Sequence, residues 1–139
     1  MLPSFEEKSV WVQLVGLVVV LGGYFVLSGV MGANGVRLLV PFVPVFIAAT
    51  VLLIIVLALG HVVAAFSGKV EKRDERDRLI GWRAESNSSW VLGSGAFFAI
   101  TALIVGIEPV WVVHLLLASM FLSEVLKLAL QLHYYKRGV

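Results

Sequence analysis

The sequence predicts an all-α, polytopic membrane protein: a four-transmembrane-helix bundle with a charged cytoplasmic helical loop. Two observations predict this class. The 139-residue chain is 60% hydrophobic and only 14% charged, with a mean hydropathy of +0.97, whereas soluble domains are about 25% charged. Residues 69–85 also hold 11 of the 20 formally charged residues. A membrane imposes such confinement, because a charged side chain at mid-depth costs about 2.5 to 3.5 kcal/mol.

Long uncharged stretches give the number of spans. The first three contain 28, 31 and 22 residues, and each exceeds the roughly 20 residues that a helix needs to cross about 30 Å of hydrocarbon. A fourth apolar stretch is interrupted only by Glu124 and Lys127. We therefore expect one integral membrane domain over residues 1–139, with spans at about 10–30, 41–67, 87–106 and 109–135 and a charged loop at 68–86.

Turn and cap residues mark the ends of these spans. Pro41 and Pro44 suit the first turn of the second span, where a missing N–H is harmless. The link from Gly106 to Pro109 is so short that the third and fourth spans must form an antiparallel hairpin. The polar run at residues 86–89 supplies N-cap groups for the third span.

The distribution of basic residues predicts the orientation. With four spans, both termini and the central loop share one side of the membrane. That side holds nine basic residues: Lys8, Lys69, Lys72, Arg73, Arg76, Arg78, Arg83, Lys136 and Arg137. The other side has Arg37 alone, so the positive-inside rule predicts a multi-pass protein of the cell membrane with both termini in the cytoplasm.

The same composition excludes several classes. No basic patch is free of acidic residues, so a nucleic-acid partner is not expected. The absence of cysteine rules out disulfides, thiolate metal sites and a cysteine nucleophile. No nucleophile motif, phosphate-binding loop or metal constellation is present, so we do not expect an enzyme.

The charged block at residues 69–85 has two interpretations. Its six basic and five acidic residues give a net charge of only +1, unlike a polybasic lipid-binding segment. As a helix it would form the pairs Arg73–Asp77, Asp74–Arg78 and Glu75–Arg78. It is then either a solvated extension of the second span on the membrane surface, or a docking element for a cytoplasmic protein or a second copy of the chain.

If the segment is a docking element, a defined set of residues would contact the partner. These candidate docking residues are Arg73, Asp74, Glu75, Arg76, Asp77, Arg78, Trp82 and Arg83. Leu79, Ile80 and Trp82 give this segment apolar surface to bury. A metal site from the acidic residues is not expected, because the adjacent arginines neutralise their carboxylates.

The same segment carries a family resemblance. Residues 74–84, DERDRLIGWRA, resemble the D-E-R-[DE]-x-x-I-x-x-[RK]-A signature of small four-span prokaryotic predicted membrane proteins of unknown function. Residues 124–138 are similar to the terminus of the same group. The resemblance implies a four-helix membrane fold, sometimes associated with cytoplasmic transcriptional regulators. It brings no activity, ligand or catalytic residue.

The fourth span carries a polar stripe. Glu124, Lys127, Gln131 and Tyr135 lie within about 80° on a helical wheel, and such a stripe does not face lipid comfortably. Other spans place polar residues at the same depth. We therefore expect an intramembrane polar cluster in the cytoplasmic half, formed by Gln13, His61, Ser94, Glu124, Lys127 and Gln131.

That cluster has a structural and a functional interpretation. Glu124 and Lys127 are spaced i, i+3, so they form either a structural ion pair or part of an ion or substrate site. Contact between Glu124 and His61 would allow a proton relay. Because His61 and His114 should differ in depth by roughly 15 to 20 Å, bound haem is not expected, nor any other cofactor or metal.

Small and weakly polar residues predict close helix packing. Gly16 and Gly23 share one face of the first span, and a heptad-spaced ladder runs through Asn87, Ser94 and Thr101 of the third. A four-helix bundle has little interior, so a solute pathway would need a half-open cavity or a homo-oligomer. Two functions follow: an interaction or regulatory module that docks a cytoplasmic partner through residues 69–85, or a small ion or solute transporter or channel using Glu124.

Overall fold

The computed structural model describes residues 5–66 and 74–138, and within them it contains helices and no strand, which confirms the all-α class. The elements are α1 (Phe5–Ala33), the short 3-10 helix η1 (Val40–Phe42), α2 (Val43–Phe66), α3 (Glu75–Ile104) and α4 (Pro109–Arg137). Each of these four α-helices is long and apolar enough to cross a membrane. The chain is therefore a multi-pass helical membrane protein.

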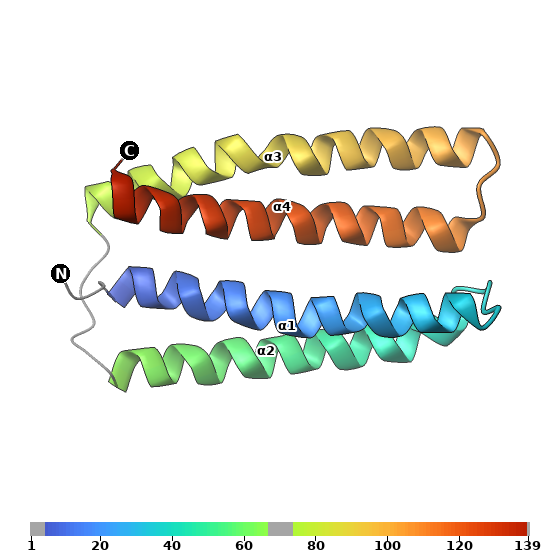
Figure 1. Cartoon of the computed structure of the whole chain (residues 1–139), viewed down its shortest axis with the longest axis horizontal. Coiled ribbons are helices and arrows are strands. Elements are labelled where there is room, and N and C mark those ends of the chain that lie inside the picture. Colours follow the sequence, from blue (N-terminus) through green and yellow to red (C-terminus); the bar gives the residue numbers. More distant parts are fainter. Residues whose placement is uncertain (1–4, 67–73, 139) are drawn as a thin grey trace.

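The helices pack as two antiparallel hairpins, α1 with α2 and α3 with α4, and α1 and α4 join the hairpins (Figure 1). The predicted hairpin of the third and fourth spans is thus confirmed, and its link turns at Gly106, which has a positive φ of 83°. α1 begins and α4 ends at the same end of the molecule (Figure 1). We call it the charged end, because α3 begins there with its charged segment.

Prolines lie at the beginnings of two helical segments. Pro41 lies in the first turn of η1, which leads directly into α2, as the prolines predict. α4 begins at Pro109, and Glu108 before it accepts a hydrogen bond from Trp111 Nε1 at 3.2 Å. Proline is tolerated in the first turn of a helix, because its missing N–H would have no helical partner there.

The beginning of α3 differs from the prediction. The helix begins at Glu75 and not near residue 87, and Asp74 is its N-cap. Asp77 N donates to Asp74 Oδ1 at 2.7 Å, and Asp74 N donates to Asp77 Oδ2 at 3.1 Å. This reciprocal capping box satisfies two backbone N–H groups that would otherwise lack partners.

Two predictions about this segment are therefore wrong. The serines of residues 86–89 do not cap a helix; Ser88 and Ser89 lie inside α3 and donate to the carbonyls of Glu85 and Ser86. Serine tolerates a helix interior when its hydroxyl bonds a preceding carbonyl. The charged block, in its described part from Asp74 onward, is also not an extension of the second span, since it forms the first turns of α3.

The length of α3 indicates where its charged segment lies relative to the membrane. Its 30 residues span about 45 Å, about 15 Å more than the hydrocarbon core of a bilayer. The excess corresponds to about ten residues, which matches the charged segment from Glu75 to Glu85. We therefore place this segment beyond the hydrocarbon as an uninterrupted continuation of a membrane-spanning helix.

Glycines allow close approach in both hairpins. In the first, a Cβ on Gly60 would overlap Val12, and one on Gly16 would lie 3.1 Å from Val56. In the second, a Cβ on Gly95 would overlap the Ser119 side chain. The prediction for Gly23 is wrong: it is exposed, and a Cβ there would meet nothing within 4 Å.

Candidate functional site

Polar contacts join α3 to α4 at the charged end. Tyr135 Oη donates to Asp77 Oδ1 at 2.9 Å, and Asn87 Nδ2 donates to Tyr134 Oη at 2.7 Å. Deeper in the hairpin, Ser123 Oγ donates to the carbonyl of Ser88 at 3.1 Å. These contacts hold the charged segment of α3 against the last turns of α4.

Buried and charged side chains strengthen the same contact. Ile80 and Ala84 are fully buried, with 0% of their surface exposed. The Arg83 guanidinium lies 6.0 Å from the centre of the Tyr134 ring, and Arg76 donates to the carbonyl of Tyr135 at 3.4 Å. The charged segment is thus fixed on one face.

The opposite face of this segment is open. Trp82 is 74% exposed and Leu79 is 52% exposed, and the charged side chains of Glu75 and Arg78 are exposed beside them. On a helical wheel these four residues lie opposite the buried Ile80 and Ala84. We call Glu75, Arg78, Leu79 and Trp82 the outer face of α3.

The predicted charge pairs of this segment do not form among the described residues. Asp74 and Asp77 instead use their carboxylates for the capping box and for Tyr135. Arg78 has no ion pair in the described part of the chain. The candidate docking residue Arg73, and with it the pair Arg73–Asp77, lies outside the described residues.

The ion pair of the fourth span forms as predicted, with a third member. Lys127 Nζ pairs with Glu124 Oε2 and lies 3.3 Å from Glu85 Oε2 of α3. The lysine side chain is 20% exposed and that of Glu124 is 49% exposed. This triad of two carboxylates and one ammonium has a formal net charge of −1.

The other residues of the predicted polar cluster do not gather around Glu124, so the prediction of a single cluster is wrong. His61 Nε2 lies 2.9 Å from Ser9 Oγ, which also accepts from Gln13 Nε2 at 3.2 Å. No hydrogen bond or ion pair joins this α1–α2 group to Glu124 in the described part of the chain. The condition for a proton relay between Glu124 and His61 is therefore not met.

The remaining members also differ from the prediction. Ser94 donates to the carbonyl of Val91 within its own helix, and Thr101 likewise to that of Phe97. Only Asn87 of the predicted ladder reaches α4. Gln131 is buried, but no hydrogen bond links it to the other predicted members within the described residues.

A second histidine site, which the sequence did not predict, lies toward the other end of the molecule. His114 Nε2 is 3.1 Å from Tyr24 Oη, and its ring stacks on the Tyr24 ring with centroids 5.9 Å apart. His114 Nδ1 donates to the carbonyl of Val110 at 2.7 Å, so in the neutral ring Nε2 accepts the tyrosine hydroxyl proton. Phe42 contacts the same imidazole edge-on, with centroids 4.7 Å apart.

His61 uses the same arrangement. Its Nδ1 donates to the carbonyl of Leu57 at 2.6 Å, and its Nε2 accepts from Ser9. Ser9 and Tyr24 are 15 positions apart in the sequence, about 22 Å along α1, so the two imidazoles cannot bind one iron. Within residues 5–66 and 74–138, no three His, Asp or Glu side chains come together as a metal site.

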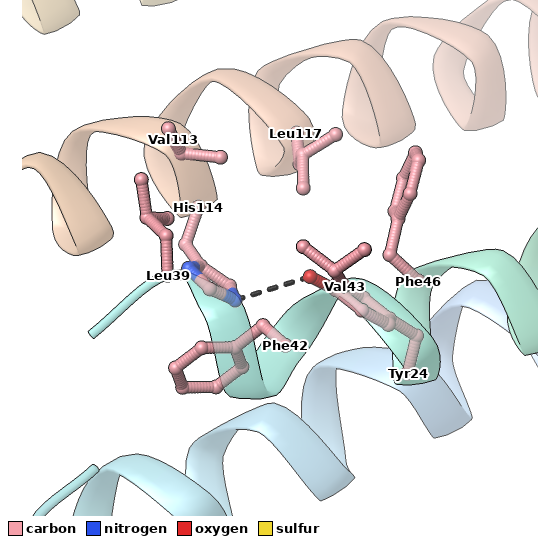
Figure 2. Close-up of a pocket in the computed structure, with 8 residues that line it drawn as sticks. All are labelled: Tyr24, Leu39, Phe42, Val43, Phe46, Val113, His114 and Leu117. Carbon is pink, nitrogen blue, oxygen red and sulfur yellow. Dashed lines mark hydrogen bonds between the residues drawn. The ribbon is translucent and has the colours of Figure 1, made fainter. Parts of the chain in front are cut away.

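An apolar cavity of about 270 Å³ adjoins the Tyr24–His114 pair (Figure 2). Its lining residues are Tyr24, Leu39, Phe42, Val43, Phe46, Val113, His114 and Leu117. A second cavity of about 220 Å³ shares Tyr24, Phe46 and Leu117 with it. That second cavity extends between α1, α2 and α4 to Glu124, the only charged residue among its described lining.

Comparison with known proteins adds no further constraint. No protein-family model, curated protein or solved structure matches this chain. The similarity of residues 74–84 to small four-span prokaryotic proteins therefore stays a prediction. The fold defines the class as a four-span helical membrane protein, and the contacts of its own residues carry the functional argument.

Proposed function

We propose that this chain is a membrane-embedded interaction or regulatory module that docks a cytoplasmic protein through the outer face of α3. The observation that carries the proposal is Trp82, a 74% exposed indole on a segment fixed to α4 by Tyr135 and Asp77. An exposed aromatic side chain on a fixed backbone is a good binding anchor, because the segment that carries it need not become ordered when a partner binds.

The chemistry of the outer face defines the partner. Leu79 and Trp82 offer apolar surface, while Arg78 and Glu75 lie beside them with exposed groups of opposite charge. An apolar pocket whose rim carries a carboxylate opposite Arg78 and a basic side chain opposite Glu75 would complement this arrangement. The partner that fits is therefore a soluble protein with an apolar cleft and a rim that carries both charges.

The proposal requires that the protein lies in a prokaryotic cell membrane with its charged end on the cytoplasmic side. The basic residues support this orientation, because Arg76, Arg78, Arg83 and Arg137 lie at the charged end and Arg37 lies at the other. Reporter fusions test it. A reporter placed after Gly138 should be active only in its cytoplasmic form, and one inserted beside Arg37 only in its external form.

Photo-crosslinking in cells tests the docking itself. A photoreactive amino acid at Trp82 should capture a soluble protein, whereas the same residue at Trp90 should capture none. Trp90 is a matched control, because it is 66% exposed, lies on the same face of α3, and is about 12 Å further toward the hydrocarbon. Trp82→Ala should then weaken binding of the captured protein by about tenfold.

The crosslinking experiment can also reject the proposal. Tryptophan is enriched at membrane interfaces as a lipid anchor. If both positions capture only lipid, Trp82 is such an anchor and the outer face of α3 is not a docking surface.

A second candidate function is transport of an ion or solute, and a specific observation favours it. Glu124 lines the second cavity and has a half-exposed side chain, although its carboxylate also pairs with Lys127. Ionisable residues within membrane helices commonly mark transport pathways. Flux into liposomes should be lost in Glu124→Gln and kept in Glu108→Gln, whose carboxylate lies outside the cavity. Unchanged flux in Glu124→Gln would remove this carboxylate from the mechanism.

A further inference from the structure

We propose that the two adjoining cavities form one binding groove for an organic cation with an aromatic or alkyl body. We call it the aromatic groove. It is defined by the shared residues Tyr24, Phe46 and Leu117, with His114 toward one end and Glu124 toward the other. His114 and Glu124 are ten positions apart in α4, which corresponds to a groove about 15 Å long.

Aromatic rings supply the first part of the recognition. Tyr24 and Phe46 pack edge-to-face with ring centroids 6.0 Å apart, and Phe25 and Phe121 pair further along at 5.6 Å. Aromatic faces carry negative electrostatic potential and attract cations, most strongly where water is excluded. No lysine or arginine is among the described residues that line either cavity. The lining thus favours a cation over an anion.

The carboxylate at the end of the groove supplies the second part. Glu124 belongs to the triad with Lys127 and Glu85, whose net charge is −1. Of the three, Glu124 lines the apolar cavity, and an ion that leaves water to enter the cavity interacts with this carboxylate more strongly than it would in water. A cation bound in the groove would balance this charge.

The histidine end of the groove is not suited to an anion. Both nitrogens of His114 already have partners, Val110 and Tyr24. The imidazole therefore presents no free N–H donor to a ligand. Its role in the groove is to hold the Tyr24 ring in place, so that the aromatic faces are preorganised for the ligand.

A lipid chain is the competing occupant. Phe46 is 41% exposed and Met120 is 52% exposed, so the groove opens sideways toward the membrane. An acyl chain would fill the apolar part but would gain nothing from the Glu124 carboxylate. The groove's charge at one end is what favours an organic cation, and it is also what the experiment must test.

The experiment compares two ions of the same shape and opposite charge. Tetraphenylphosphonium and tetraphenylborate are titrated onto the full-length protein in detergent, with protein-free micelles subtracted. We expect saturable binding of the phosphonium and none of the borate. In Glu124→Gln the phosphonium should bind at least about tenfold more weakly, while Glu108→Gln should bind it as the unchanged protein does.

A second pair of variants covers the case that loss of Glu124 disturbs folding. Phe46→Leu removes one aromatic face from the groove and should weaken phosphonium binding by about threefold to tenfold. Phe97→Leu makes the same change on α3, where the ring is 68% exposed and outside the groove, and should have no effect. Circular dichroism checks that all four variants keep their helices.

Several outcomes would overturn the inference. Equal binding of both ions, or phosphonium binding that neither Glu124→Gln nor Phe46→Leu changes, would leave the groove to lipid chains. The organic cation proposed here is the ligand class for the second candidate function, transport, and it rests on the same site at Glu124. The ligand class and the transport function can fail separately. Phosphonium binding without flux would reject transport but not this ligand class. Glu124-dependent flux of another ion, without phosphonium binding, would reject this ligand class but not transport.

Discussion

The two hairpins are held together by different chemistry. α1 and α2 meet mainly by shape, with Val12 over Gly60 and Val56 against Gly16, and among the described contacts a polar group around Ser9 crosses between them. α3 and α4 also meet at a glycine, but several hydrogen bonds and an ion pair cross between them as well. In the part of the chain that the structure describes, the first hairpin therefore depends more on shape, and the second more on polar contacts.

Because of this difference, the two hairpins contribute differently to the candidate functional sites. In lipid there is no hydrophobic force between helices, so small residues and hydrogen bonds decide which helices associate. The polar contacts of the α3–α4 hairpin lie between Ser88 and the charged end, and they fix to α4 the charged segment that we place outside the hydrocarbon. The α1–α2 hairpin instead contributes aromatic and apolar walls to the groove that ends at Glu124.

The largest expected effect comes from filling a glycine contact. Gly95→Val would place methyl groups where the Ser119 side chain lies, so α3 and α4 must separate or distort. We expect destabilisation of about 1 to 3 kcal/mol, measured by reversible unfolding in mixed detergent micelles. Gly93→Val is the control, because a Cβ there meets nothing within 4 Å. Equal stability of the two variants would show that this contact does not hold the hairpin.

A smaller effect is expected from the polar group around Ser9 in the first hairpin. Ser9→Ala leaves His61 Nε2 without its hydrogen-bond partner and also removes an acceptor from Gln13. The expected loss is about 1 kcal/mol, toward the upper part of the range for hydrogen bonds between membrane helices. A double-mutant cycle with His61→Ala measures the coupling. A coupling energy near zero would mean that shape alone holds α1 and α2.

The smallest effect is expected where polar links are several. Ser123→Ala removes the hydrogen bond to the carbonyl of Ser88, but the contacts of Tyr134, Tyr135 and Lys127 remain. We expect a loss of about 0.6 kcal/mol, the average for such bonds, in the same unfolding assay. A loss larger than that of Ser9→Ala would reverse the comparison between the hairpins.

Much of the fold could be predicted from sequence, because span number depends only on hydrophobic length and charge position. The Glu124–Lys127 pair could be predicted too, because i, i+3 spacing within one helix fixes the distance. The beginning of α3 could not, since a dense charged run indicates a loop until Asp74 and Asp77 are recognised as a capping box. That shift is also why the contact of Glu85 with Lys127 was missed.

Contacts between helices were the least predictable part. Depth and helical wheels place Gln13, His61 and Glu124 at similar heights, but they do not say which neighbouring helix each face meets. His61 meets α1 through Ser9, and Glu124 meets α3 through Lys127. The Tyr24–His114 pair was missed for the same reason, because no spacing within one helix relates the two residues.

The central claim is that α3 is one continuous helix that carries its charged segment out of the bilayer on α4. Because the chain has no cysteine, single nitroxide labels can be introduced at each position from 75 to 93 in lipid vesicles. We expect accessibility to oxygen and to a water-soluble nickel complex to vary with an unbroken period of about 3.6 residues, with minima at Ile80, Ala84 and Ser88. Contact with the nickel complex should fall beyond about residue 86. A break in the period between positions 85 and 90, with labels at Leu79 and Trp82 at one constant lipid depth, would contradict the account and place the charged segment flat on the membrane.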